Sequence, residues 1–283
     1  MKNKSSLMFL LKVILFVLII ILILLVLFLY NMIINEKNKT PKITNKKIVK
    51  EFSLKDIEYL NFDFKNYDVK YLITNGDKLI IKQTGKVNKM CIDKRKNKNK
   101  IIVKESVSNI FDKKYYKIYI PKSYVGKTSI ENGFGNISVS NISDVTINNN
   151  SGNVIVKNSK TISLQNVSGF INIDGEINNI SGSSSTGNIK IDKIIGSCNI
   201  ETITGNIEIK NFLIQSKSKI ETTSGDMLIK VDKKSDCKLK YNNKNEYNIS
   251  KKKCIDGENE LLLKNVTGNI TIRWWHFKIL WYN

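Results

Sequence analysis

Residues 185–209 read STGNIKIDKIIGSCNIETITGNIEI, and this stretch contains one phrase twice: Gly, then Asn, then Ile. The phrase, a Gly followed by Asn or Asp and an aliphatic residue, recurs through residues 128–229 and once near the end of the chain. Its glycines are Gly135, Gly152, Gly169, Gly187, Gly205, Gly225 and Gly268, with a degenerate copy at Gly169. They lie 17, 17, 18, 18, 20 and 43 residues apart, the last close to two periods with one phrase lost. A period of this size indicates a repeat architecture.

Apolar residues flank each glycine at fixed offsets. They stand seven and five positions before it, as Val145 and Ile147 do, and two and four positions after it, as Val154 and Val156 do. Alternation at a period of two, with many β-branched residues, is typical of strands with one buried face. Each repeat is therefore predicted to be a strand, a Gly turn at positive φ, a second strand and a connection.

A polar residue stands three positions before each glycine, in phase with the apolar positions, so its side chain is expected to point inward. This polar ladder comprises Asn132, Asn149, Asn166, Ser184, Thr202, Thr222 and Asn265. Copies stacked at about 4.7–4.8 Å could hydrogen-bond to one another and to the turn backbone. A meander of antiparallel hairpins is the rival interpretation, since Ser-Gly-Asn also suits a hairpin turn. Recurrence of the same residue types favours an all-β fold, a β-solenoid of about seven to eight rungs.

The start of the chain is predicted to be a membrane anchor behind a short tail at residues 1–12. Residues 13–30 contain no charge, and the apolar run continues to Ile34. At about 1.5 Å per residue, this run is long enough to cross about 30 Å of hydrocarbon. A cleaved signal peptide is the alternative, but the run is long and no small-x-small cleavage site comes after it. We expect an uncleaved transmembrane signal anchor at residues 13–34.

Lysines flank the anchor on both sides, so its orientation has two interpretations. Three lysines precede it, and six come after it between Lys37 and Lys50. Counted literally, the positive-inside rule favours a cytoplasmic C-terminal domain. A short tail before the first hydrophobic segment is instead typical of an anchor that exports the rest of the chain. We expect a single-pass protein of the cell membrane with an extracytoplasmic C-terminal domain.

The remaining segments are assigned from composition and strand pattern. They are a lysine-rich linker at 35–50, an irregular β-rich cap at 51–127, the solenoid at 128–273 with an insertion at 232–260, and an aromatic cap at 274–283. Within the first cap, Asn75-Gly76-Asp77 predicts a hairpin turn. The aromatic segment is expected to cover the last rung, because an open β edge invites association. A tail lying at a bilayer interface is the alternative.

These features resemble a known family, the bacterial putative adhesins with β-strand repeats. The resemblance rests on the strand Lys117–Pro121 leading into the Gly phrases, on the repeated Ser/Thr-Gly-Asn/Asp-Ile pattern and on the broken stretch before the last copy. It covers residues 50 to 273. The resemblance implies a largely uncharacterised extracytoplasmic β-solenoid, often behind a membrane segment and in some members linked to envelope stress. It implies no established catalytic residues.

The chain is strongly basic, with 46 Lys and Arg against 25 Asp and Glu and a formal net charge of +21. Such a charge raises nucleic acid, anionic lipid and acidic polymers as partners. The lysines are spread along the chain and no nucleic-acid-binding motif is present, so nucleic acid is not expected. The expected partners are the membrane, through the anchor, and anionic envelope polymers or another surface protein. No cofactor is expected.

The four cysteines lack the spacing of a metal site. Cys198 falls in an inward apolar column and is predicted to be a small core residue. Cys237 and Cys254 flank the irregular insertion, and in an exported domain they could form a disulfide.

A catalytic constellation is hard to find, because His276 is the single histidine. Glu201 and Glu221 share an outward column in neighbouring rungs, with Glu208 nearby in sequence, at about 4.8 Å per rung. That is close to the carboxyl spacing of a retaining glycosidase. Lys190 is expected beside Glu208, however, which indicates ordinary charge alternation on a wet surface.

We therefore expect no enzyme and assign no catalytic, cofactor or metal residue. The expected function is that of a membrane-anchored, adhesin-like or envelope-stress-related interaction module. A polysaccharide-active β-helix enzyme and a cytoplasm-facing membrane scaffold are the alternatives.

Overall fold

The computed structural model describes residues 21–22, 24–27, 48–85, 90–95, 99–105, 114–243, 247–249 and 257–274, apart from the side chains at 48, 85, 90–95, 105, 114, 242–243 and 247–249. The chain divides into two units, Met1–Thr44 and Asn45–Asn283. In the first, residues 21–22 and 24–27 are helical. No helix among the described residues is long and apolar enough to cross a membrane. The rest of the predicted anchor at 13–34 lies outside the described residues.

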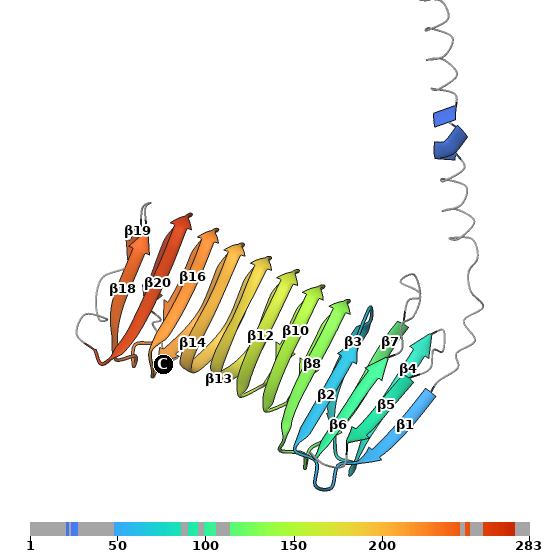
Figure 1. Ribbon diagram of the computed structural model, residues 1–283. Helices are drawn as coiled ribbons and strands as arrows, with labels where there is room; N and C mark the ends of the chain where they lie inside the picture. Colours follow the sequence, from blue (N-terminus) through green and yellow to red (C-terminus); the bar gives the residue numbers. More distant parts are fainter. Residues whose placement is uncertain are drawn as a thin grey trace, which may run out of the picture. The chain divides into compact units, whose positions relative to one another are not determined.

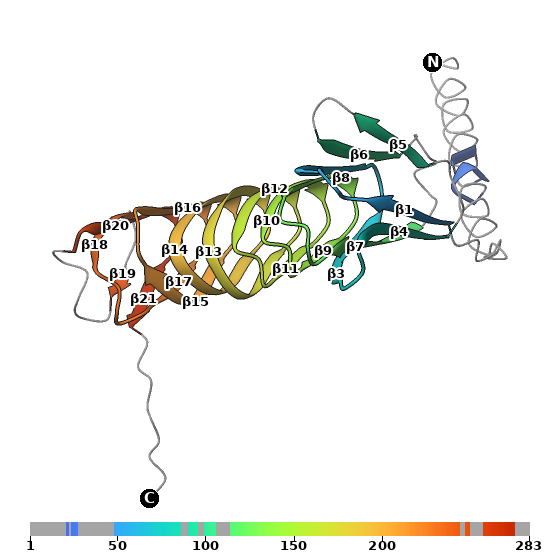
Figure 2. The same ribbon diagram turned by 90° about the horizontal axis from the view of Figure 1, so that it is seen from below.

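The second unit is a coil of strands that form two faces (Figures 1 and 2). In spatial order the first face holds β6 (Lys100–Glu105), β2 (Tyr59–Phe64), β8 (Lys127–Phe134), β10 (Asp144–Ser151), β12 (Thr161–Ser168), the later halves of β13 (Ile171–Thr186) and β14 (Ile189–Thr204), β16 (Ser218–Ser224), β20 (Asn259–Thr267) and β18 (Cys237–Asn243).

The second face has the same order. It holds β7 (Lys114–Pro121), β3 (Asp68–Thr74), β9 (Ile137–Ser140), β11 (Val154–Lys157), the earlier halves of β13 and β14, β15 (Ile207–Ile214), β17 (Met227–Val231), β21 (Ile270–Trp274) and β19 (Tyr247–Ile249). All these pairings are parallel. The meander of antiparallel hairpins is therefore wrong for the repeat region, and the predicted solenoid-like stacking is confirmed.

The core forms because equivalent apolar residues stack in register from one turn of the coil to the next. Ile147 pairs with Leu164 on the first face, and Val154 pairs with Ile171 on the second. The apolar positions predicted before and after each glycine are buried. Burial of each such side chain contributes about 1.5–3 kcal/mol, and the stacking makes the core continuous.

Each Gly phrase forms the corner between the two faces. The seven glycines have φ between +118° and +146°, which L side chains rarely adopt. A Cβ added to Gly187 would also overlap the carbonyl oxygen of Gly169 in the neighbouring turn. Glycine is thus required by backbone conformation and by contact between stacked corners.

The N-terminal end contains more regular structure than the expected irregular cap. Parallel β2 and β3 continue the stack, whereas β1 (Ile48–Ser53), β4 (Lys78–Gly85) and β5 (Met90–Arg95) pair antiparallel. The predicted hairpin at Asn75-Gly76-Asp77 is wrong, because β7 lies between β3 and β4 and pairs with both. Aromatic rings fill this end of the core, with Phe64 and Tyr116 centroids 4.6 Å apart.

The order of the layers is interleaved at both ends of the coil. Strand β2 pairs with both β6 and β8, and β3 pairs with both β7 and β9, so the layer formed by β2 and β3 lies between the other two layers. The last layer in sequence, β20 and β21, lies between that of β16 and β17 and that of β18 and β19. Strands β18 and β19, which come after Val231 in sequence, therefore form the layer beyond the last Gly phrase, and Gly268 stacks directly on Gly225.

Candidate functional site: a polar groove along the first face

Two adjoining hollows form one groove on the outer surface of the first face. They measure about 380 and 410 Å³ and share Ser183, Glu201 and Glu221. The first extends to Ser163 on β12 and the second to Val266 on β20. The groove thus crosses five stacked strands and runs obliquely toward the Gly corner.

A run of small residues explains why the surface is hollow here. The turn of the coil at Ser181-Gly182-Ser183-Ser184-Ser185 carries no side chain larger than a hydroxymethyl group. Its neighbours in register are longer, with Gln165 and Glu201 on either side of Ser183. Hydroxyl, amide and carboxylate groups therefore line a trough that is lowest at this turn.

Opposite charges are balanced within the groove. Glu221 accepts ion pairs from Lys219 at 2.8 Å and from Lys264 at 2.9 Å. Burial raises the pKa of Glu221, but hydrogen bonds from these two lysines outweigh it and hold the pKa below its ordinary value. The same contact raises the pKa of Lys219. Glu221 is therefore a paired carboxylate and not a proton donor at neutral pH.

The carboxylates weighed for glycan cleavage are only partly brought together. Glu201 and Glu221 are direct neighbours in register, as predicted. Glu208 lies on β15 of the other face, where Lys190 pairs with it at 3.1 Å. A glycosidase of either type needs one carboxyl with a raised pKa as its acid. Glu221 has the opposite shift.

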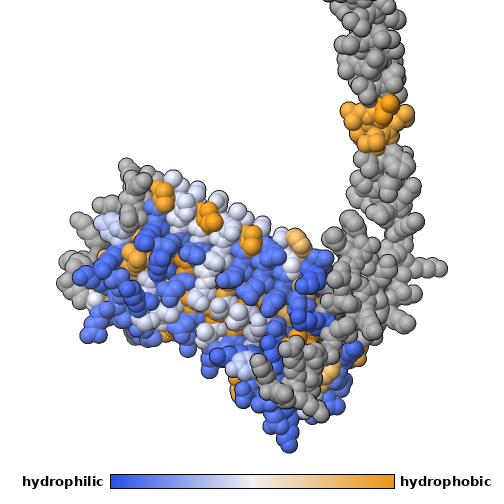
Figure 3. All heavy atoms as spheres, viewed as in Figure 1, coloured by the Kyte–Doolittle hydropathy of each residue, from blue (hydrophilic) through white to orange (hydrophobic). Residues whose placement is uncertain are grey.

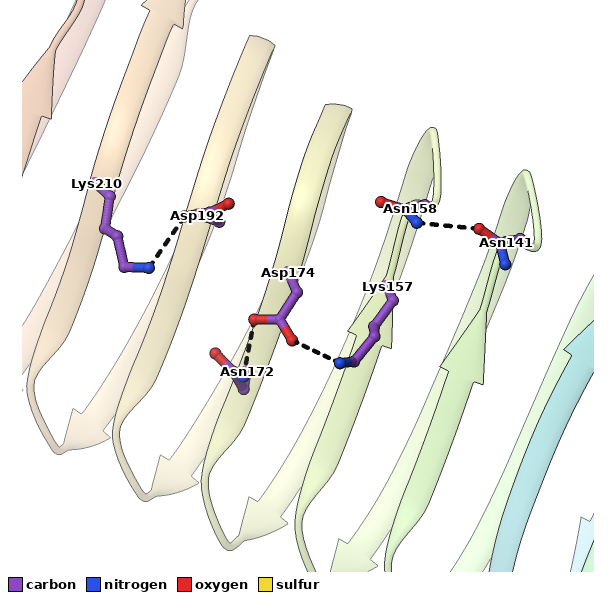
Figure 4. A network of polar contacts seen from close by, with 7 residues as sticks. All are labelled: Asn141, Lys157, Asn158, Asn172, Asp174, Asp192 and Lys210. Carbon is purple, nitrogen blue, oxygen red and sulfur yellow. Dashed lines mark hydrogen bonds and ion pairs between the residues drawn. The ribbon is translucent and has the colours of Figure 1, made fainter.

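The second face carries alternating charges that neutralise one another. Lys157 and Asp174 are 3.3 Å apart, and Asp192 and Lys210 are 3.0 Å apart (Figure 4). The hydrogen bond and charge of Asp192 raise the pKa of Lys210. Exposed pairs of this kind contribute about 0–1 kcal/mol each, so they indicate a solvated face.

The polar ladder lies inside the coil beside the Gly corners, and each of its members is about 3% exposed. Asn149 donates to Asn166 at 3.0 Å and to the carbonyl of Gly152 at 3.1 Å. Asn265 likewise donates to Gly225 at 2.9 Å, whereas Ser184 donates to the carbonyl of Thr186 at 3.4 Å. The ladder is a structural element that is almost entirely shielded from solvent.

A second, outer ladder was missed by sequence reasoning. The side-chain oxygen of the residue after the corner glycine accepts the backbone N–H of its counterpart in the next turn. Asn206 accepts from Asp226 at 2.8 Å, and Asp226 accepts from Asn269 at 2.8 Å. None of these residues has positive φ, so the unusual backbone conformation of each corner is confined to its glycine. Phe170, the degenerate member, interrupts the ladder.

The opposite corner was also missed. Asn141 and Asn158 have φ of 61° and 52°, and their side chains are joined by a 3.0 Å hydrogen bond (Figure 4). Both stand six positions after a corner glycine, which was the available sequence signal. Gly175, six positions after Gly169, continues this corner with φ of 84°, and the pairing of β13 with β14 shifts register beside it.

An apolar ridge borders the groove on its Gly-corner side. It consists of Val167, Ile203 and Val266, which are 52%, 59% and 48% exposed. Ser185 and Thr223 occupy the same position in the intervening turns. Apolar side chains stand singly along this edge of the coil with polar surface between them (Figure 3).

Cysteine chemistry differs between Cys198 and Cys237. Cys198 is a free, fully buried thiol whose pKa is raised by burial, as expected of a core residue. Cys237 is buried and disulfide-bonded. Its predicted partner, Cys254, lies outside the described residues, so this pairing stays a prediction. Within the described part of the chain, no group of three or more His, Cys, Asp or Glu side chains could hold a metal ion.

Solved structures of bacterial proteins resemble this chain. A putative adhesin from Bacteroides fragilis is 14% identical, with 81% of this chain and 98% of that chain covered and a TM-score of 0.50. A putative lipid binding protein from Parabacteroides distasonis is 15% identical over 81% and 97% of the two chains, with a TM-score of 0.41. A putative adhesin from Parabacteroides merdae is 13% identical over 81% and 97%, with a TM-score of 0.30. The likeness to the Bacteroides fragilis protein concerns the fold alone.

No curated protein matches the sequence. The profile of one family, Toastrack DUF4097, matches residues 45–273, which is most of the chain and nearly all of the β coil. This match confirms the resemblance to β-repeat adhesins inferred from the Gly phrases. The chain belongs to the Toastrack DUF4097 family.

Proposed function

We propose that the protein is a single-pass, membrane-anchored interaction module, adhesin-like or engaged in envelope stress, that presents its groove outside the cytoplasm. The observation that carries this proposal is the continuous polar groove across five stacked strands, whose most enclosed carboxylate is already paired. Such a surface suits binding of an extended polymer more than cleavage of one.

The anchor is supported by the composition of residues 13–34 and by the helical residues within it. Side chains at 21–22 and 24–27 are 50–61% exposed although all are Ile, Leu or Val. Water is a poor environment for such a surface, and a bilayer core is a favourable one.

Export is supported by the disulfide at Cys237. Disulfides persist in oxidising compartments and are rare in the cytosol. A cytoplasm-facing scaffold, which the lysines after the anchor permit, would keep this cysteine reduced.

The location is tested by protease shaving of intact cells, followed by blotting for the C-terminal domain with a cytoplasmic protein as lysis control. Loss of the domain while the control survives is the expected result. Protection in intact cells, with digestion after permeabilisation, would contradict export and favour the scaffold.

Binding through the groove is tested by placing one large side chain in the turn of small residues that makes the surface hollow. Ser183→Trp fills the trough between Gln165 and Glu201 while leaving the buried columns unchanged. We expect it to reduce retention of the full chain on isolated cell envelopes, and we expect Ser138→Trp on the other face to leave retention unchanged. Equal retention of both variants and wild type would contradict the proposal.

A glycan-cleaving enzyme is the second candidate, favoured by the adjacency of Glu201 and Glu221. It requires that a double Glu201→Ala, Glu221→Ala variant lose a measurable cleavage of envelope polysaccharide. We expect no cleavage from wild type or variant, because the pKa of Glu221 is lowered.

A further inference from the structure

The apolar ridge has a period twice that of the coil. Along five successive turns, the position two before the corner glycine reads Val167, Ser185, Ile203, Thr223 and Val266. Because neighbouring strands are about 4.8 Å apart, apolar groups recur at about 9.6 Å along the groove, with a hydroxyl midway. A polymer whose monomers have the spacing of these turns would fit this edge if every second monomer presented an apolar group toward it.

The spacing is fixed by the backbone and does not depend on mobile loops. Thr186 donates from its hydroxyl to the carbonyl of Val167 at 3.3 Å, and Thr267 donates to that of Thr223 at 3.1 Å. Flanking positions pair in register from Ser168 onward. The ridge is thus a rigid, repeating template beside the groove.

The groove beside the ridge carries no net charge, although the chain as a whole is at +21. Glu201 and Glu221 balance Lys219 and Lys264. The other polar groups are neutral donors and acceptors, among them Ser163, Gln165 and Asn199. A neutral ligand with many hydroxyl and amide groups fits this lining better than a polyanion.

We infer that the groove binds an extended β-1,4-linked polysaccharide that carries N-acetyl groups. Successive sugars of such a chain are turned by about half a rotation, so a given substituent faces one side at every second sugar. The length of its disaccharide is close to the two-turn period of the ridge. Acetyl methyl groups would contact Ile203 and Val266, the two ridge residues that line the groove, and hydroxyls of the alternate sugars would meet Ser185 and Thr223.

The inference rests on the proposed role of the groove as a binding site, and it specifies the ligand. Five strands span about 19 Å, from four spacings of about 4.8 Å. A tetrasaccharide is therefore long enough to reach two ridge residues at once.

The test is calorimetric titration of the full chain in detergent with tetra-N-acetylchitotetraose, with cellotetraose as the comparator lacking acetyl groups. We expect saturable binding of the acetylated sugar and at least tenfold weaker binding of cellotetraose. Ile203→Ser should lower the affinity for the acetylated sugar about tenfold, because it removes the central apolar contact of the ridge. The matched control is Phe134→Ser, which removes an apolar side chain of similar exposure, 58% against 59% for Ile203, on the same edge but outside the groove.

Equal affinity for the two sugars, no binding of the acetylated one, or equal affinity of wild type and Ile203→Ser would each overturn the inference. Failure here is distinguishable from failure of the proposed function. If Ser183→Trp still abolishes retention on cell envelopes while the acetylated sugar does not bind, the groove is a binding site for another polymer. If Ser183→Trp changes neither, the proposed function fails as well.

Discussion

Substitution of the central corner glycine, Gly187→Ala, should destabilise the coil by about 2–4 kcal/mol. A side chain at φ of +132°, a region essentially restricted to glycine, costs about 1–3 kcal/mol. The added Cβ overlaps the carbonyl oxygen of Gly169, so the two corners must move apart. That movement weakens two hydrogen bonds between the turns, Gly169 N–H to Thr186 at 3.2 Å and Ile171 N–H to Asn188 at 2.9 Å, each contributing about 0.5–1.5 kcal/mol.

The assay is urea unfolding of the full chain, monitored by far-ultraviolet circular dichroism. With an m value of about 3 kcal/mol/M, the midpoint should fall by about 1 M. Gly76→Ala is the control, because a Cβ there meets nothing closer than 3.7 Å and its φ is not positive. Its free energy of unfolding should stay within about 0.5 kcal/mol of the wild-type value. If both variants unfold at the wild-type midpoint, close stacking of the glycines is not what requires them.

Three further predictions concern other parts of the coil. Phe170→Asn should stabilise the protein by about 0.5–1 kcal/mol, because it supplies the missing acceptor for the N–H of Asn188; an unchanged or lower urea midpoint would contradict the outer ladder. Because the pKa of Glu221 is lowered in the folded state, its ion pairs stabilise the fold above its unfolded-state pKa of about 4.3, and this stabilisation is lost as pH falls through the lower folded value. Glu221→Gln should therefore make the urea midpoint less dependent on pH between pH 5 and 2. The same pH dependence in wild type and variant would show that the two lysines contribute nothing to stability through Glu221. Cys237→Ser should cost about 3 kcal/mol and leave Cys254 open to alkylation without reductant, as read by intact mass; alkylation of Cys254 in the wild type would exclude the predicted pairing.

The sequence was sufficient to predict the repeating features. The columns before and after each glycine are buried, and the strands pair in register, because stacking equivalent positions is the only arrangement that buries all of them together. The outer ladder was missed because an Asn after Gly is equally compatible with a turn conformation. Its role as an acceptor for the next turn depends on a contact between turns that no local pattern encodes.

The candidate site was less predictable than the fold. Glu201 and Glu221 were placed correctly as neighbours, since the repeat sets their register. The groove itself depends on Ser181 to Ser185 being small relative to both adjacent turns, which is a difference between repeats and not a repeated feature. The insertion of β7 between β3 and β4 was likewise invisible, because a local turn signal cannot report a third strand that arrives forty residues later.

The interleaved layers have a mechanical consequence at the C-terminal end of the coil. In a simply wound coil, the last turn in sequence is also the outermost, so a pull on the chain end peels one ladder of hydrogen bonds at a time. Here the strands nearest the C-terminus, β20 and β21, are held on both sides. Tension applied after Trp274 must shear two interfaces at once, whereas spontaneous fraying starts at β18 and β19, where no load enters. The coil is thus built to resist unwinding when force acts on the strands nearest its C-terminus.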